Sequence, residues 1–174
     1  MRKIAFYGAV SLDGYLADEK DELQWLFDTN LAGKSTYEAF EKELDTLVMG
    51  RTTYEASKKM VEDGAFYPGK EKIIFSHTLQ NGETDETFVS GDVVTILSEF
   101  QKKQGQMIWI VGGGGILHPL LEAKKIDEIW LQIAPVLLGR GKRLFEKGNY
   151  RYRFELVEVT QMGELTELHL RRKK

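Results

Sequence analysis

The segment "IWIVGGGGILHPLL", residues 108–121, joins an apolar run to a second apolar pattern through four glycines. The first run is typical of a buried strand, whereas the second places apolar residues on one helical stripe, which predicts a strand, a glycine turn and a helix. Glycines at such a junction let phosphate approach the free N–H groups and positive dipole of a helix start. They also permit tight packing of a helix on a strand, so both interpretations stay open for this run alone.

The glycine run fits neither of two familiar phosphate-binding motifs. In the spacing G-x-G-x-x-G, Leu117 stands where the last glycine is required. The Gly-Lys-Ser/Thr ending of a P-loop is missing as well. A phosphate-binding role for the run therefore needs support from elsewhere in the chain.

Outward from this segment, strand patterns and helix patterns alternate along the chain. Apolar runs predict strands at 3–10, 46–50, 71–76, 106–111 and 126–139. Helical patterns occupy 21–28, 36–44, 51–63, 91–103 and 115–125, and Asp92 is suited to cap the helix at 91–103. Residues 153–171 predict a hairpin around Met162 and Gly163. The turn-rich stretch 77–90 predicts a mobile loop, in which 87–90 could add a short strand.

This order predicts an α/β fold in three layers. Alternating strands and helices make a mainly parallel sheet flanked by helices on both faces, and the hairpin adds antiparallel strands at one edge. The chain has 174 residues and shows neither an internal repeat nor a flexible linker, so we expect one domain over 1–174.

Composition argues against several classes of function. The formal net charge is −3, and basic residues are scattered apart from the terminal "RRKK", so nucleic acid is not an expected partner. The chain has no cysteine, and its three histidines are far apart, so we expect no metal site. The N-terminus is typical of a first strand rather than a signal peptide, and no stretch is apolar enough to span a membrane. We therefore expect a cytoplasmic protein without a membrane partner.

A second junction supports phosphate binding. In "LVMGRTTYE", residues 47–55, a strand ends at Gly50, and Arg51, Thr52 and Thr53 fill the first turn of a helix. Ligands of parallel α/β sheets bind outside the carboxyl ends of the strands. The two junctions together could therefore hold a dinucleotide.

Four segments resemble the dihydrofolate-reductase-like superfamily in order and approximate spacing. They are "AFYGAVSLDGYLA" (5–17), "LVMGRTTYE" (47–55), "KIIFSHT" (72–78) and "IWIVGGGGILHPLLEAKKIDEIWLQIAPVLLGRGKRLF" (108–145). The resemblance is greatest to the reductase domain of bacterial riboflavin biosynthesis and its stand-alone homologues. It implies hydride transfer from NADPH to a pterin-like or pyrimidine heterocycle, related to the reaction of 5-amino-6-(5-phosphoribosylamino)uracil reductase.

The resemblance also implies which residues bind NADPH. The adenosine and phosphate half would meet Gly50, Arg51, Thr52, Thr53, Ser76, His77 and Thr78. The pyrophosphate and the nicotinamide would meet Val111, Gly112, Gly113, Gly114, Gly115, Ile116 and Leu117, with Ala9, Val10, Ser11 and Gly14 on the first strand and its turn. Arg51 suits a 2′-phosphate, although an exposed arginine at a helix start is common without any ligand. No carboxylate stands at 76–78 to repel that phosphate, so NADPH is preferred over NADH.

The substrate half of the motif set departs from the family. Asp13 and Glu38 are the catalytic candidates, and Tyr7, Tyr37 and Glu41 are the substrate-binding candidates. An aspartate before glycine is first of all typical of a turn, and a charge such as Glu38 on an amphipathic helix is usually on a solvated face. Tyr7 replaces a family lysine, Gly112 replaces a family glutamate, and the zinc-binding deaminase domain is missing.

Three hypotheses follow from these departures. The first is a reductase, the second is a non-catalytic NADP(H)- or nucleotide-binding protein without its substrate site, and the third is a structural module whose glycines serve packing.

The strand pattern at 126–139 predicts a homodimer. Its two sides are both largely apolar, with Trp130, Gln132, Ala134 and Val136 on one and Ile129, Leu131, Ile133 and Pro135 on the other. Both sides need cover. A second copy bound through the C-terminal strands could supply it, as the resemblance implies, and the helix at 92–103 is the alternative within one chain.

Overall fold

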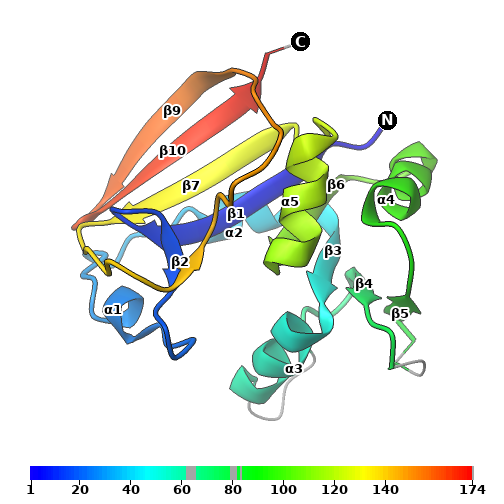
Figure 1. Cartoon of the computed structure of the whole chain (residues 1–174), viewed down its shortest axis with the longest axis horizontal. Helices are drawn as coiled ribbons and strands as arrows, with labels where there is room; N and C mark the ends of the chain where they lie inside the picture. The colour runs from blue at the N-terminus through cyan, green and yellow to red at the C-terminus, as the bar shows by residue number, and fades with distance from the viewer. Residues whose placement is uncertain (62–65, 79–81, 83, 174) are drawn as a thin grey trace.

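The computed structural model describes residues 1–61, 66–78, 82 and 84–173 (Figure 1). The strands are β1 (Ile4–Ser11), β2 (Tyr15–Ala17), β3 (Leu44–Gly50), β4 (Glu71–Phe75), β5 (Glu86–Val89), β6 (Met107–Gly112), β7 (Glu128–Ala134), β8 (Lys142–Arg143), β9 (Phe154–Met162) and β10 (Leu165–Arg172). The helices are α1 (Gln24–Phe27), α2 (Tyr37–Glu41), α3 (Arg51–Met60), α4 (Val93–Lys102) and α5 (Gly114–Glu122).

The main sheet has the strand order β5-β4-β3-β6-β1-β7-β10-β9. From β5 to β7 neighbouring strands run parallel, and β10 is antiparallel to both β7 and β9. Strands β2 and β8 pair separately as a small antiparallel ribbon. The predicted fold, a mainly parallel sheet with an antiparallel hairpin at one edge, is confirmed.

Helices cover both faces of the parallel part of the sheet, and the alternation along β1 shows how. Ile4 and Phe6 pack in a core cluster with Leu97 of α4 and Leu120 of α5. Ala5 and Tyr7 point to the opposite face, where a second cluster contains Phe40 of α2 and Tyr54 of α3. A strand buried on both faces needs this continuous apolar sequence.

Several predicted boundaries were wrong. The strand expected over 126–139 ends at Ala134, because Pro135 has no N–H to continue a ladder. The helices expected at 21–28 and 36–44 are the short α1 and α2, and Leu44 already belongs to β3. The helix expected over 51–63 ends at Met60, and 62–63 lie outside the described residues.

The stretch 77–90, predicted as a mobile loop, contains a strand of the main sheet. β5 pairs in parallel with β4, with Thr87 opposite Ile73, so the short strand weighed for 87–90 is confirmed with shifted bounds. Residues 79–81 and 83 of the same stretch lie outside the described part of the chain.

The apolar faces of β7 are covered in part by the same chain. Ile129 is buried in a cluster against which Tyr150, Tyr152 and Phe154, from the segment leading into β9, also pack. The edge strand β9 nevertheless leaves Leu156 and Val159 exposed by 59% and 54%. The homodimer stays a prediction.

Within the described residues, no helix has the length and apolar character needed to cross a membrane.

Candidate functional site

Two helices begin side by side at the carboxyl ends of the parallel strands. Gly50 precedes α3 and Gly113 precedes α5, and a Cβ built on Gly113 would lie 3.7 Å from the backbone nitrogen of Gly50. Gly113 has a φ of +100°, a conformation that glycine adopts without strain. The two starts therefore present their free N–H groups to the same space.

Neither of these two starts is capped by a described side chain, and neither has an acidic residue in its first turn. The start of α4 differs, because the Asp92 carboxylate accepts a hydrogen bond from the backbone N–H of Thr95 at 2.8 Å. An uncapped start keeps its donors and its positive dipole available to an anion. The arrangement at α3 and α5 thus suits a phosphate group.

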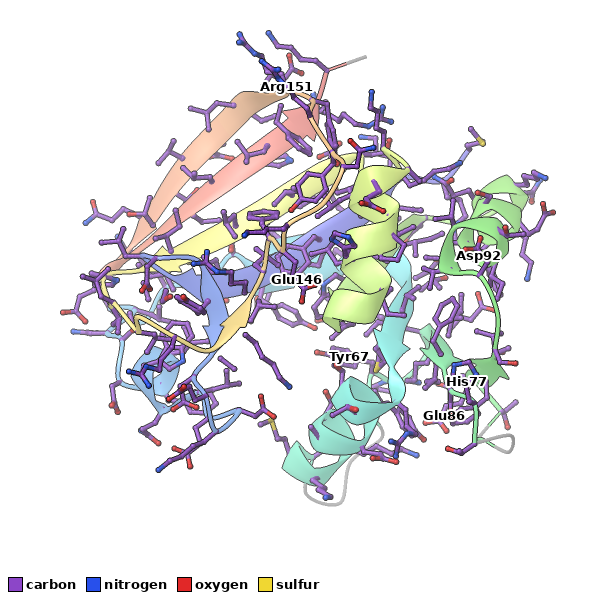
Figure 2. The ribbon with its side chains drawn as sticks, in the orientation of Figure 1. Tyr67, His77, Glu86, Asp92, Glu146 and Arg151 are labelled. Carbon is purple, nitrogen blue, oxygen red and sulfur yellow. The ribbon has the colours of Figure 1, made fainter. Side chains whose placement is uncertain are left out.

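A pocket of about 400 Å³ lies in front of these helix starts, and we call it the strand-end pocket. It is lined by Gly50, Arg51, Thr52, Thr53, Phe75, Ser76, His77, Val89, Ser90, Gly91, Val93, Gly113, Gly115 and Ile116. Most of its walls are therefore the ends of β3, β4 and β5 and the starts of α3, α4 and α5. Figure 2 shows His77 beyond β4 and Asp92 at the start of α4, on the same side of the molecule.

Nine residues predicted to bind the cofactor come together in this pocket. They are Gly50, Arg51, Thr52, Thr53, Ser76, His77, Gly113, Gly115 and Ile116. The Arg51 guanidinium pairs with Glu55 one helical turn away at 3.1 Å, and its side chain is about half exposed. An exposed pair of this kind contributes little, so the guanidinium can turn toward a ligand.

Sequence reasoning missed the side of the pocket formed by Val89, Ser90, Gly91 and Val93. A signal was available in "FVSGDVV", residues 88–94, which repeats the order of a strand, a glycine and a helix. The turn-rich character of 77–90 favoured a loop there, so this third junction was not recognised as part of the site.

Other predicted cofactor residues lie outside the lining of the strand-end pocket. Val10 and Leu117 are buried in the core. Ala9, Val111 and Gly112 lie at the carboxyl ends of the neighbouring strands β1 and β6, Thr78 follows Ser76 beyond β4, and Gly114 is the first residue of α5.

The Ser11–Gly14 segment forms a tight turn. The Ser11 hydroxyl donates to Asp13 at 2.6 Å, and the same carboxylate accepts the backbone N–H groups of Leu138 and Gly139 at 3.1 and 2.7 Å. The hydrogen bond from Ser11 is the main reason that the pKa of Asp13 falls to about 2, and the two backbone donors add to it. Gly14 completes the turn at a φ of +89°. Asp13 thus ties the end of β1 to the loop after β7, and its predicted catalytic role stays a prediction.

The substrate-binding candidates lie on the face of the sheet covered by α2. Tyr7 stacks on Phe40 with ring centroids 4.5 Å apart, and the rings of Tyr7 and Tyr37 meet in a T-shaped arrangement with centroids 5.8 Å apart. Glu41 is half-buried at the end of α2, whereas Glu38 is exposed in its first turn. The structure therefore brings Tyr7, Tyr37 and Glu41 together and leaves the catalytic candidate Glu38 in solvent.

The fold, with its pocket at the carboxyl ends of parallel strands and its glycine-led helix starts, defines a dihydrofolate-reductase-like domain. Residues 2–168 match the family model described as the RibD C-terminal domain, and the chain belongs to this family.

Individual relatives agree with this assignment. The chain is 30% identical to the Bacillus subtilis protein YwjB, over 97% of each chain. A Shewanella sp. PV-4 protein described under riboflavin biosynthesis superposes with a TM-score of 0.86 at 26% identity, over 99% of both chains. Dihydrofolate reductase from Enterococcus faecalis, solved with NADP(H), gives a TM-score of 0.67 at 17% identity, over 99% of this chain and 97% of that one. The last likeness concerns the fold alone.

Proposed function

We propose that this chain is an NADPH-dependent reductase of a small planar heterocycle. The observation that carries the proposal is the meeting of two uncapped helix starts, at Gly50 and Gly113, in one pocket at the carboxyl ends of β3, β4 and β6. A dinucleotide has the phosphates that such donors bind, and the solved dihydrofolate reductase with this fold holds NADP(H).

The residues of the strand-end pocket fit the nucleotide half of this cofactor. The N–H groups at the starts of α3 and α5 would bind phosphate oxygens, and the hydroxyls of Thr52 and Thr53 would add donors. A Cβ built on Gly115 meets no atom within 4 Å, so this glycine leaves its side of the pocket open. Arg51 would pair with the 2′-phosphate as a planar fork.

The nicotinamide end would lie against Ala9, Val111 and Gly112, which are only partly buried at the ends of adjacent strands. The bound cofactor would supply the hydride. The chain itself would hold the acceptor on the face covered by α2, keep water away with its aromatic side chains, and position a proton donor.

Binding of NADPH, NADH and ATP to the purified protein tests the proposal. We expect NADPH to bind more tightly than NADH, and to be oxidised when pterins or pyrimidines are added. NADPH binding without oxidation across such a panel would favour the second hypothesis, a nucleotide-binding protein without a substrate site. Binding of none of the three nucleotides would contradict the proposal and favour glycines that serve packing. We also propose that the chain acts as one domain and as a homodimer, since β9 exposes Leu156 and Val159.

A further inference from the structure

A cluster of aromatic side chains fills the face of the sheet under α2. Tyr7 of β1, Tyr37 of α2 and Tyr67 of the segment before β4 surround Trp109 of β6. The ring centroids of Tyr37 and Tyr67 lie 6.0 and 5.6 Å from that of Trp109. We call these four residues the tyrosine cluster.

The tyrosine cluster adjoins the proposed nicotinamide position. On β1, Tyr7 and Ala9 are two residues apart and point to the same face, and on β6 the same holds for Trp109 and Val111. One such step spans about 7 Å, which is the length of a small ring system. A planar acceptor beside the nicotinamide would therefore reach the cluster, and this reasoning rests on the proposed function.

Hydrogen bonds fix the Tyr7 hydroxyl in place. The Gln132 side-chain amide donates to it at 2.6 Å and to the Glu167 carboxylate at 2.8 Å. Thr36 donates its hydroxyl proton to Glu167 at 2.7 Å, so at 3.1 Å it accepts the proton of Tyr7. Tyr7 thus has both a donor and an acceptor partner within the protein, and is not available to a ligand.

The Tyr37 hydroxyl is different. Its oxygen is buried and makes no hydrogen bond of good geometry to any described residue, and its one partner is the Tyr67 hydroxyl, to which it donates only weakly. A buried hydroxyl with only this weak partner costs free energy, and a better acceptor on a ligand recovers that cost. Burial raises the pKa of Tyr37, and Tyr67 and Glu41 raise it further, so the hydroxyl stays a neutral donor.

The carboxylates of Glu41 and Glu167 lie next to the tyrosine cluster. Glu41 raises the pKa of both Tyr37 and Tyr67, and Glu167 raises that of Tyr7, so each carboxylate is close enough to act on the cluster. The Lys70 ammonium also lies beside α2, but it donates to the backbone carbonyls of Glu41 and Leu44 at 2.9 Å each. These two carboxylates outweigh the one ammonium, so a phosphate on the substrate would be repelled here.

We propose that the tyrosine cluster is the substrate end of the site, that Tyr37 donates a hydrogen bond to the substrate, and that the substrate is a planar heterocycle without a phosphate group. This class differs from the phosphoribosyl substrate that the family resemblance implies. It also explains why Tyr7 can stand where the related reductases carry a lysine, because no phosphate needs a cation there.

Matched pairs of compounds test the substrate class. The protein saturated with NADPH is titrated with 5-amino-6-ribosylaminouracil and its 5′-phosphate, and with riboflavin and its 5′-phosphate, while tryptophan fluorescence is recorded. We expect at least one unphosphorylated compound to bind at least about tenfold more tightly than its 5′-phosphate. We expect Glu41→Gln to reduce this ratio of affinities, because it removes a negative charge. Equal or tighter binding of both phosphates overturns the inference, and so does binding of none of the four.

The Tyr37→Phe variant tests the donor, with Tyr152→Phe as its control. Tyr152 has a buried hydroxyl without a described partner, but it lies by β9, away from the tyrosine cluster. We expect both variants to be as stable as the parent or more stable, and only Tyr37→Phe to weaken the unphosphorylated compound by about tenfold. Unchanged binding in Tyr37→Phe overturns its role. NADPH binding stays normal in either case, whereas its loss in the parent protein would count against the proposed function instead.

Discussion

Gly50 and Gly113 stand at the starts of two different helices, close enough that a Cβ on Gly113 would contact the backbone nitrogen of Gly50. The chain thereby brings two sets of free N–H groups to one pocket without a described side chain to cap either. This relationship suggests that the glycine run serves to bind phosphate. Mutation can distinguish that role from a role in packing.

Gly115→Ala distinguishes phosphate binding from packing. Gly115 lines the strand-end pocket within the first turn of α5, and a Cβ there meets no atom within 4 Å. Alanine is also the better helix former, so we expect the melting temperature to hold or rise. The new methyl group would occupy the space of a phosphate, and we expect NADPH affinity to fall at least about tenfold.

Gly113→Ala serves as the contrasting variant. Its φ of +100° strains any residue with a Cβ, so we expect it to lose on the order of 1–3 kcal/mol of stability. Normal NADPH affinity in a stable Gly115→Ala protein would assign the glycines to packing.

Arg51 decides the choice between cofactors if it meets the 2′-phosphate. Arg51→Ala should weaken NADPH by about 1.5–3 kcal/mol, the range for hydrogen bonds to charged groups, and leave NADH almost unchanged. Glu55→Gln should strengthen NADPH slightly, because it releases the guanidinium from its 3.1 Å partner. Isothermal titration of both cofactors provides the measurement. Equal losses for NADPH and NADH in Arg51→Ala would rule out this role.

The sheet pattern could be predicted because each parallel strand carries its own apolar run. In β6, for example, residues 107–110 are buried on both faces, and the sequence is apolar throughout. β5 was predicted only as an alternative at 87–90, because an edge strand of four residues gives a short pattern and tolerates the charged Glu86, and its pairing with β4 fixes its bounds.

The candidate site also has one part that local sequence motifs predict and another part that only the folded chain brings together. Local motifs predicted that one helix begins after Gly50 and another at the glycine run 112–115, and the structure places the second start at Gly113. The hydrogen bonds around Tyr7 join Thr36, Gln132 and Glu167, which come from elements far apart in the chain. No local pattern distinguishes a buried Glu167 from an exposed one, because that difference arises only when β10 pairs with β7.

Glu128 should make the stability depend on pH in the acid range. Burial alone would raise the pKa of this carboxyl, but Lys3, His169 and Arg171 bring it below its usual 4.5. A lowered pKa in the folded state contributes stability above the unfolded value, and this contribution is lost as the pH falls through the folded value. We expect Glu128→Gln to be less stable than the parent at pH 7, with the difference shrinking below about pH 4.5. Urea unfolding across this range measures it, and a constant difference would contradict the assignment.

The exposed residues of β9 provide a test of association. Light scattering should give about twice the 19.9 kDa mass of one chain at micromolar concentration. Replacing Leu156 or Val159, exposed by 59% and 54%, with lysine should shift the protein to a single chain without unfolding it. A parent protein that is already a single chain would mean that the segment before β9 gives sufficient cover.

The central claim is that the two helix starts form a dinucleotide site, and titration of the parent protein with NADPH and NADH, followed by nicotinamide fluorescence, tests it most directly. We predict saturable binding of NADPH that is at least about tenfold tighter than that of NADH, since only NADPH has the charged group that Arg51 would meet. Failure of NADPH to bind at any concentration up to the millimolar range would contradict the account.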